Sequence, residues 1–166
     1  MYLEALNLLK FIVGSLAPHL TGLDLHLMIG QFIGLIVTNA GCINMRVRVA
    51  SDKVVIYFAK HSNIGSFIVA KEVLKNIERI STAMKVPPPS SMSQEEYQEE
   101  LRQKMEVLVR LFSILQMLLQ QFSIVLCYQQ DFYVQSLGHI ADAMNAHAEK
   151  EPALKSTCTQ LVISLC

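Results

Sequence analysis

The sequence predicts an all-α protein built from stacked pairs of helices within a single domain. Apolar residues recur at the spacing of a helix face along most of the chain. No segment gives a convincing pattern for a β-strand. Glycine is rare, with 7 in 166 residues, so the connections between helices are expected to be short. These observations together indicate helices packed on helices around one core.

The composition limits the classes of protein to which the chain can belong. Lys and Arg number 14, as do Asp and Glu, and a net charge of zero argues against a nucleic-acid binder. A hydrophobic content of 52% excludes intrinsic disorder. The charged fraction is 17%, below the usual ~25%. This apolar excess is typical of a segment of a larger protein built from stacked helices.

Each helix is expected from its own apolar face and its own end signals. Pro18 stops the first helix, and Ser66 is expected to cap the fourth. Residues 45–60 are rich in Val and Ile, but their length and their helical neighbours favour a helix over a strand. The expected helices cover residues 4–16, 23–39, 45–60, 67–84, 94–122, 131–148 and 152–166.

The second of these helices is apolar on nearly every side, which predicts that neighbours bury it all round. His26, within it, is expected to be a core histidine bonded to a backbone group. The turn that follows contains Gly41, a natural residue just after a helix end, and Asn44, a plausible cap of the next helix.

A Pro/Ser-rich linker over residues 86–93 separates the fourth helix from the fifth, because three consecutive prolines forbid helix. Ser93 and Glu96 have the spacing of a capping box at the start of the fifth helix. The apolar stretch 107–127 is long enough to span a membrane. However, an Arg at the centre costs roughly 2.5–3.5 kcal/mol on insertion. We therefore expect an amphipathic helix with Arg110 on its polar side, and no membrane partner.

The four cysteines have no metal-ligand spacing, so we expect reduced, buried thiols in an intracellular protein. They are Cys42, Cys127, Cys158 and Cys166. The first residues form a poor signal peptide, because Glu4 precedes the first basic residue.

Internal repetition is the main finding. Helix starts at Met1 and Asn44 are about 43 residues apart, within the ~40–47-residue repeat of HEAT and armadillo proteins. A similar start follows at Glu151. The sequence therefore predicts a HEAT/armadillo-like α-solenoid over residues 1–166, with an unrelated helical bundle as the alternative.

The segment from residue 23 to residue 77 resembles the middle of a TOG domain, the HEAT-repeat module that binds tubulin. The likeness rests on a helix entered through a turn containing Asn44, with Arg46 and Arg48 in its first turn, and on the short polar loop that follows it. It is nearest to the divergent TOG domains of a ciliary-tip centrosomal protein and of a MEKK-type MAP kinase kinase kinase. The chain supplies fewer repeats than a complete TOG domain, so N-terminal repeats are expected to be missing. It contains no Trp, the residue that the family exposes in its first tubulin-facing loop.

The resemblance implies that the loops at residues 18–22, 60–65 and 121–131 line one edge, which meets the tubulin heterodimer. It also implies a cytoplasmic protein, associated with the cytoskeleton, centrosome or cilium. Two of these loops offer basic or hydrogen-bonding groups to an acidic partner. Their candidate binding residues are His19, Thr21, Lys60, His61, Ser62 and Asn63. Lys60 could equally serve the dipole of its own helix, and Asn63 could bond its own backbone.

No catalytic constellation is found, so no enzyme, cofactor or metal is expected. The chain lacks a Gly-rich phosphate loop and a G-x-S-x-G elbow. His139 and Asp142 are expected to be an exposed pair, although with His147 they share a helix face that could hold a metal. Two alternative functions remain. The chain could be a scaffold that binds a peptide or partner helix in its curved face without tubulin, or a structural segment of a larger solenoid.

Overall fold

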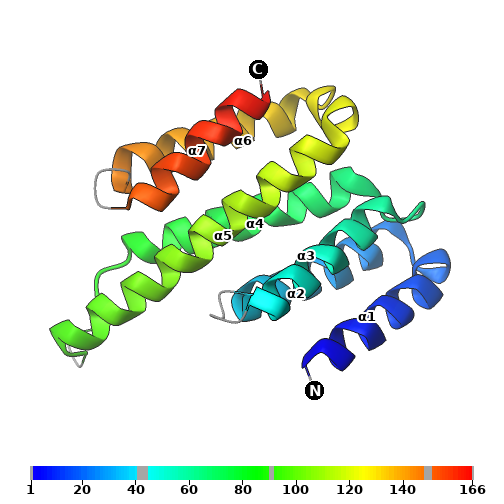
Figure 1. The fold of residues 1–166 in the computed structure, drawn as a ribbon, viewed down its shortest axis with the longest axis horizontal. Helices are drawn as coiled ribbons and strands as arrows, with labels where there is room; N and C mark the ends of the chain where they lie inside the picture. Colours follow the sequence, from blue (N-terminus) through cyan, green and yellow to red (C-terminus); the bar gives the residue numbers. More distant parts are fainter. Residues whose placement is uncertain (1, 41–44, 90–91, 148–150, 166) are drawn as a thin grey trace.

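The computed structural model confirms the all-α prediction and describes residues 2–40, 45–89, 92–147 and 151–165 (Figure 1). These residues form seven α-helices and one short 3-10 helix, and no strand occurs among them. The elements are α1 (Tyr2–Leu16), η1 (Ala17–His19), α2 (Gly22–Ala40), α3 (Met45–Lys60), α4 (Gly65–Lys85), α5 (Gln94–Cys127), α6 (Gln130–His147) and α7 (Pro152–Leu165).

The helices pack in two layers that alternate along the chain. In one layer α1 packs on α3, α3 on α5 and α5 on α7; in the other α2 packs on α4 and α4 on α6. From α2 onward, each helix also packs on the next one. The helices succeed one another across the molecule, from α1 at the lower right of Figure 1 to α7 at the upper left. One apolar core runs between the layers, and Phe58 and Phe112 are among its largest fully buried side chains.

The turns between the layers alternate between two ends of the molecule. Those that follow η1, α3 and α5 all lie at the right-hand end in Figure 1. The connection from α4 to α5, which contains Pro87–Pro89, lies at the opposite end. Every second turn therefore lies at the same end of the molecule.

The predicted entry into α5 is confirmed in detail. Ser93 Oγ accepts a hydrogen bond from the backbone N–H of Glu96 at 3.2 Å, and the Glu96 carboxylate accepts one from the Ser93 N–H at 2.9 Å. The predicted end of this helix at Phe122 coincides with a kink, since Phe122 alone has non-helical angles, φ −130° and ψ 25°. The chain becomes helical again after Phe122 and continues to Cys127, beyond the predicted end.

The predicted cap of α4 is wrong. The helix begins at Gly65, its N-cap is Ile64, and no side chain caps it. Ser66 instead lies buried in the first turn. Gly65 has φ +79°, a conformation that favours glycine, so the turn geometry and not a hydroxyl starts this helix. The predictions for Gly41 and Asn44 lie outside the described residues.

The prediction that α2 is buried on all sides is also wrong. Ile29 and Ile33 are fully buried, but Leu23, Leu27 and Leu35 are 71%, 60% and 60% exposed. The reason is that α2 belongs to the first pair of helices. It packs on α3, α4 and α5, and no helix of the described chain covers its outer side.

The apolar face predicted for α5 is confirmed, because all of its members are buried: Leu108, Leu111, Phe112, Leu115, Leu118 and Leu119. Arg110 was expected on the polar side but is only 9% exposed, since α3 covers that side of α5 and supplies Asp52 as its ion-pair partner. Among the described helices, α5 is the one long and apolar enough to cross a membrane. In its most apolar stretch of 18 residues, 44% is buried inside the fold.

The cysteine prediction is confirmed at one position and wrong at another. Cys158 is buried in α7, and this burial raises the pKa of its thiol to about 11. Cys127 is exposed, because it lies at the last residue of α5, beyond the kink. Cys42 and Cys166 lie outside the described residues.

Candidate protein-binding edge

The three loops that the sequence singled out lie at the same end of the helices (Figure 1). We call this end the turn edge and define it by η1 with Leu20 and Thr21, residues 60–65 and residues 121–131. The alternation of the two layers is what brings them together, since each of these turns leads from the first layer into the second.

The first turn holds two of the candidate residues, His19 and Thr21, and both are exposed. Thr21 Oγ donates a hydrogen bond to Asp24 Oδ2 at 2.5 Å and accepts one from the Asp24 N–H at 3.3 Å. This reciprocal pair stabilises the start of α2. The Thr21 hydroxyl is therefore engaged locally, whereas His19 is the group that this turn presents to solvent.

The second turn holds the other four candidates on consecutive residues. Lys60, Ser62 and Asn63 are exposed, and His61 is half-buried. Ser62 Oγ donates to Asn63 Oδ1 at 3.0 Å, and the Asn63 N–H donates to His61 Nδ1 at 3.4 Å. Side chains within the turn thus hold one another, and Lys60 is the exposed cation at its entrance.

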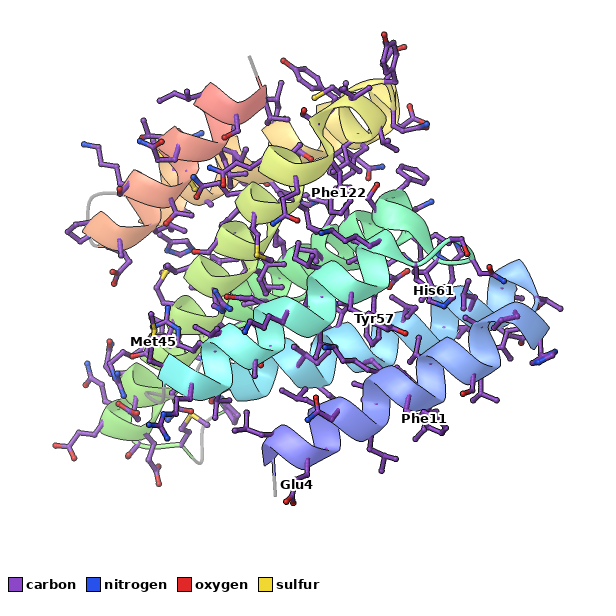
Figure 2. The ribbon with its side chains drawn as sticks, turned by 45° about the vertical axis from the view of Figure 1, so that its right-hand side comes forward. Glu4, Phe11, Met45, Tyr57, His61 and Phe122 are labelled. Atoms are coloured by element: carbon purple, nitrogen blue, oxygen red, sulfur yellow. The ribbon has the colours of Figure 1, made fainter. Side chains whose placement is uncertain are left out.

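Tyr57 anchors this second turn to α1. Its ring meets the His61 ring edge-on at 6.1 Å between centroids, and Lys10 Nζ lies 5.4 Å from the centre of the Tyr57 ring. A Cβ on Gly14 would lie 2.6 Å from the Tyr57 hydroxyl, so only glycine lets α1 approach this closely without a shift of Tyr57. Figure 2 shows Tyr57, on α3, near His61, the first residue after this helix.

The third turn adds an apolar component that was not expected from the sequence. Tyr128 is 85% exposed and Ile124 is 76% exposed, while Leu126 between them is buried. The sequence carries no local signal for this exposure, because Leu119, Phe122 and Leu126 continue the helical spacing of the apolar face. The turn edge therefore combines cationic, imidazole and aromatic groups.

The structure brings the candidate residues to one edge but does not join them into a single cluster. Among the described residues, no hydrogen bond or ion pair links His19 or Thr21 to residues 60–63. An array of separated donors suits a broad protein surface better than a small ligand, which needs convergent groups in a concave pocket.

A second polar site lies between α2 and α4, on the outer face of the second layer. Glu72 is 5% exposed and pairs with Lys75 Nζ at 2.5 Å and with His26 Nδ1 at 3.5 Å. The prediction of a core His26 bonded to the backbone is therefore wrong, because its ring is partly exposed and faces a carboxylate. Sequence reasoning missed this site, since it read α2 as buried all round.

No three His, Cys, Asp or Glu side chains of the described chain are grouped to hold a metal ion. His139 and Asp142 line a shallow groove between α4 and α6, together with Lys71 and Lys75. No family model, curated protein or solved structure matches the chain.

Proposed function

We propose that this chain is a protein-binding module that presents its turn edge to a partner, and that this partner is the tubulin heterodimer. The observation that carries the proposal is the gathering of three turns, distant in sequence, at one end of the helices (Figure 1). A row of turns held by a rigid helical body can contact a surface much larger than any single loop.

The packing of the helices supports a HEAT-like solenoid as the frame of this module. Each helix from α3 onward packs on the helix two before it, as stacked helix pairs require. In such a stack the positions of the turns relative to one another are fixed, because each turn joins two helices that pack against the neighbouring helix pair. Binding then needs little ordering of the loops, which preserves affinity.

The side chains of the turn edge supply the chemistry that an acidic partner needs. Lys60 is exposed, and His19 and His61 add imidazole groups that can form hydrogen bonds. Charges at such a rim raise the association rate more than the affinity. Tyr128 and Ile124 supply exposed apolar area, and an exposed Tyr is a frequent anchor of protein interfaces.

The test is size-exclusion chromatography of the chain with unpolymerised tubulin dimer, at low and moderate salt. We expect co-elution that weakens as salt rises and that is lost in K60E. Lys85 provides the matched control, because it is exposed and in the last turn of α4, as Lys60 is in the last turn of α3, but at the opposite end of the molecule. K85E should therefore co-elute like the unsubstituted chain.

Three outcomes would contradict the proposal. The first is that the elution volume of the chain does not change when tubulin is added. The second is that K60E and K85E weaken co-elution equally, which would indicate unspecific charge attraction. A Y128A variant that binds as well as the unsubstituted chain would remove the third turn from the interface. Circular dichroism of each variant establishes that a loss of binding is not a loss of fold.

A further inference from the structure

Two lines of side chains run side by side on the outer face of the second layer. On α2, Leu23, Leu27 and Leu35 recur at multiples of four residues and are all more than half exposed. On α4, Lys71, Lys75 and Arg79 recur every four residues and are exposed. The two helices run in the same direction, because His26 faces Glu72 while Gly34, two turns further on, faces Asn76 and Arg79.

A groove with a volume of about 380 Å³ separates Leu23 and Leu27 of the apolar line from Lys75 and Arg79 of the cationic line. Glycines on α2 create it. A Cβ on Gly30 would lie 2.6 Å from Glu72 Oε2, and a Cβ on Gly34 would lie 3.4 Å from Asn76 Oδ1. The side chains of Glu72 and Asn76 therefore fill the space that larger residues of α2 would occupy, and they form the floor of the groove.

The polar groups at the floor of the groove have hydrogen-bond and charge partners within the protein. Glu72 is neutralised by Lys75, and the Asn76 amide donates to the Glu72 carbonyl at 2.8 Å. Arg79 donates one hydrogen bond, at 3.0 Å, to Asn76 Oδ1. A guanidinium has five N–H donors, so most of those on Arg79 are directed to solvent at the lip of the groove. The groove is thus apolar on one lip and positively charged on the other.

The charges of the neighbouring groove sharpen this asymmetry. Glu78 and Asp142 line the groove on the other side of α4, against α6, together with Lys71 and Lys75, so its carboxylates and ammonium groups are equal in number. In the groove against α2, Lys75 and Arg79 outnumber the single carboxylate of Glu72. A ligand with carboxylates is therefore attracted to the α2–α4 groove and has no such preference for the α4–α6 groove.

We propose that the α2–α4 groove binds an acidic amphipathic helix of another protein, with its apolar face on the leucine line and its carboxylates on Arg79. The spacing of both lines carries the choice of a helix. Four residues advance an α-helix by ~6 Å, so a helix laid along the groove presents a side chain every turn at the same interval. From Leu23 to Gln31 the groove is ~12 Å long, or about two turns of a bound helix.

The groove fits a helix better than a membrane surface. Its polar floor of Glu72 and Asn76 lies below both lips, where a flat bilayer would leave it unfilled. A carboxylate of a bound helix, in contrast, reaches Arg79 in a planar, two-point geometry that favours Arg over Lys. This surface is distinct from the turn edge, and the inference does not rest on tubulin binding.

The experiment is fluorescence anisotropy of the full chain with a labelled peptide of about 18 residues, ~27 Å long as a helix. Its leucines follow a spacing of three and four, and glutamates occupy one flank. A second peptide has lysines in place of the glutamates. We expect saturable binding of the glutamate peptide in the micromolar range and binding of the lysine peptide at least about tenfold weaker.

Variants of each lip test the assignment. R79E should weaken the glutamate peptide at least about tenfold and should strengthen the lysine peptide, which is a reversal that unfolding cannot produce. L27Q should weaken both peptides, since the leucine line is shared. K53E, on an exposed position of α3 in the other layer, is the matched control and should change neither.

Several results would overturn the inference. These are equal affinity for both peptides, an equal effect of R79E and K53E, or no binding of the glutamate peptide. Binding of phosphatidylserine vesicles that depends on Leu27 and Arg79, without peptide binding, would assign the surface to membranes instead. K60E separates the two proposals, because it should abolish tubulin co-elution and leave the peptide affinity unchanged.

Discussion

Arg110 on α5 and Asp52 on α3 form an ion pair that ties together two helices of the same layer. The Arg110 guanidinium also donates to the backbone carbonyl of Arg48 at 3.4 Å. The two side chains are unequally buried, with 10% of Arg110 and 28% of Asp52 exposed. The carboxylate can regain water when its partner is removed, whereas the guanidinium cannot.

This asymmetry predicts that the two ends of the pair differ in their effect on stability. D52A should lower the free energy of unfolding by about 2–3 kcal/mol, because it leaves the buried Arg110 guanidinium without its side-chain hydrogen-bond acceptor. R110M should cost under about 1 kcal/mol, because Met fills the space and Asp52 remains partly hydrated. Urea denaturation of both variants measures the difference. Equal losses, or a larger loss in R110M, would show that the burial of Arg110 does not determine the free energy lost when the pair is broken.

The same aspartate predicts a pH dependence. Burial raises the pKa of Asp52 above its usual 3.8, and this effect exceeds the opposing attraction of Arg110. A raised pKa in the folded state means that Asp52 contributes stability below pH 3.8, and that this contribution is lost as pH rises through the raised pKa. D52N stays neutral and lacks this dependence. The stability of D52N relative to the unsubstituted chain should therefore increase from pH 3.5 to pH 7, in denaturant titrations at each pH; a constant difference would contradict the raised pKa.

Gly30 and Gly138 form a matched pair of helical glycines with opposite expected behaviour. A Cβ at Gly138 would meet nothing within 4 Å, so G138A should raise the free energy of unfolding by roughly 0.5–1 kcal/mol through helix propensity alone. A Cβ at Gly30 would meet Glu72 Oε2 at 2.6 Å and Cδ at 3.2 Å, where Glu72 is buried. G30A should therefore lose about 1–2 kcal/mol, as the methyl group displaces a buried carboxylate from its partners.

Thermal unfolding of the two variants checks this prediction, with the unsubstituted chain as reference. If G30A were as stable as G138A, the prediction would be wrong. The Glu72 side chain at the floor of the α2–α4 groove could then change its position without loss of stability.

The two described cysteines should differ in reactivity. Cys127 is exposed at the end of α5, and Cys158 is buried with its pKa raised to about 11, so little thiolate is present at neutral pH. Iodoacetamide at pH 7.5 should modify Cys127 within minutes and Cys158 only at the rate at which α7 opens. Mass spectrometry of peptides follows each cysteine separately. Equally fast labelling of both would mean that α7 detaches from α5 readily.

Much of the helical architecture could be predicted from the sequence, because its signals are local. The apolar face of α5 and the capping box of Ser93 and Glu96 depend only on spacing along one helix. The same reasoning failed for Arg110 and for the leucines of α2. A helical pattern shows which residues share a face, but not whether another helix lies against that face.

The residues of the candidate site likewise divide into those with a local sequence signal and those whose environment depends on distant segments. Lys60 at the end of a helix and the polar turn after it could be located from the sequence, since helix ends have local signals. The exposure of Tyr128 depends on which helices reach the end of α5, and the carboxylate partner of His26 comes from α4, more than forty residues away. Neither is recorded in local spacing, because each depends on how distant segments meet.

The segment around Pro87–Pro89 lies at the end of the molecule opposite the turn edge, and this position has a practical consequence. Extra residues inserted there lengthen a connection that is already outside the helices, and doubling the length of a loop costs only about 0.6 kcal/mol. A fluorophore, a purification tag or a second folded domain can therefore be joined at this point, and a partner bound along the turn edge would not encounter it.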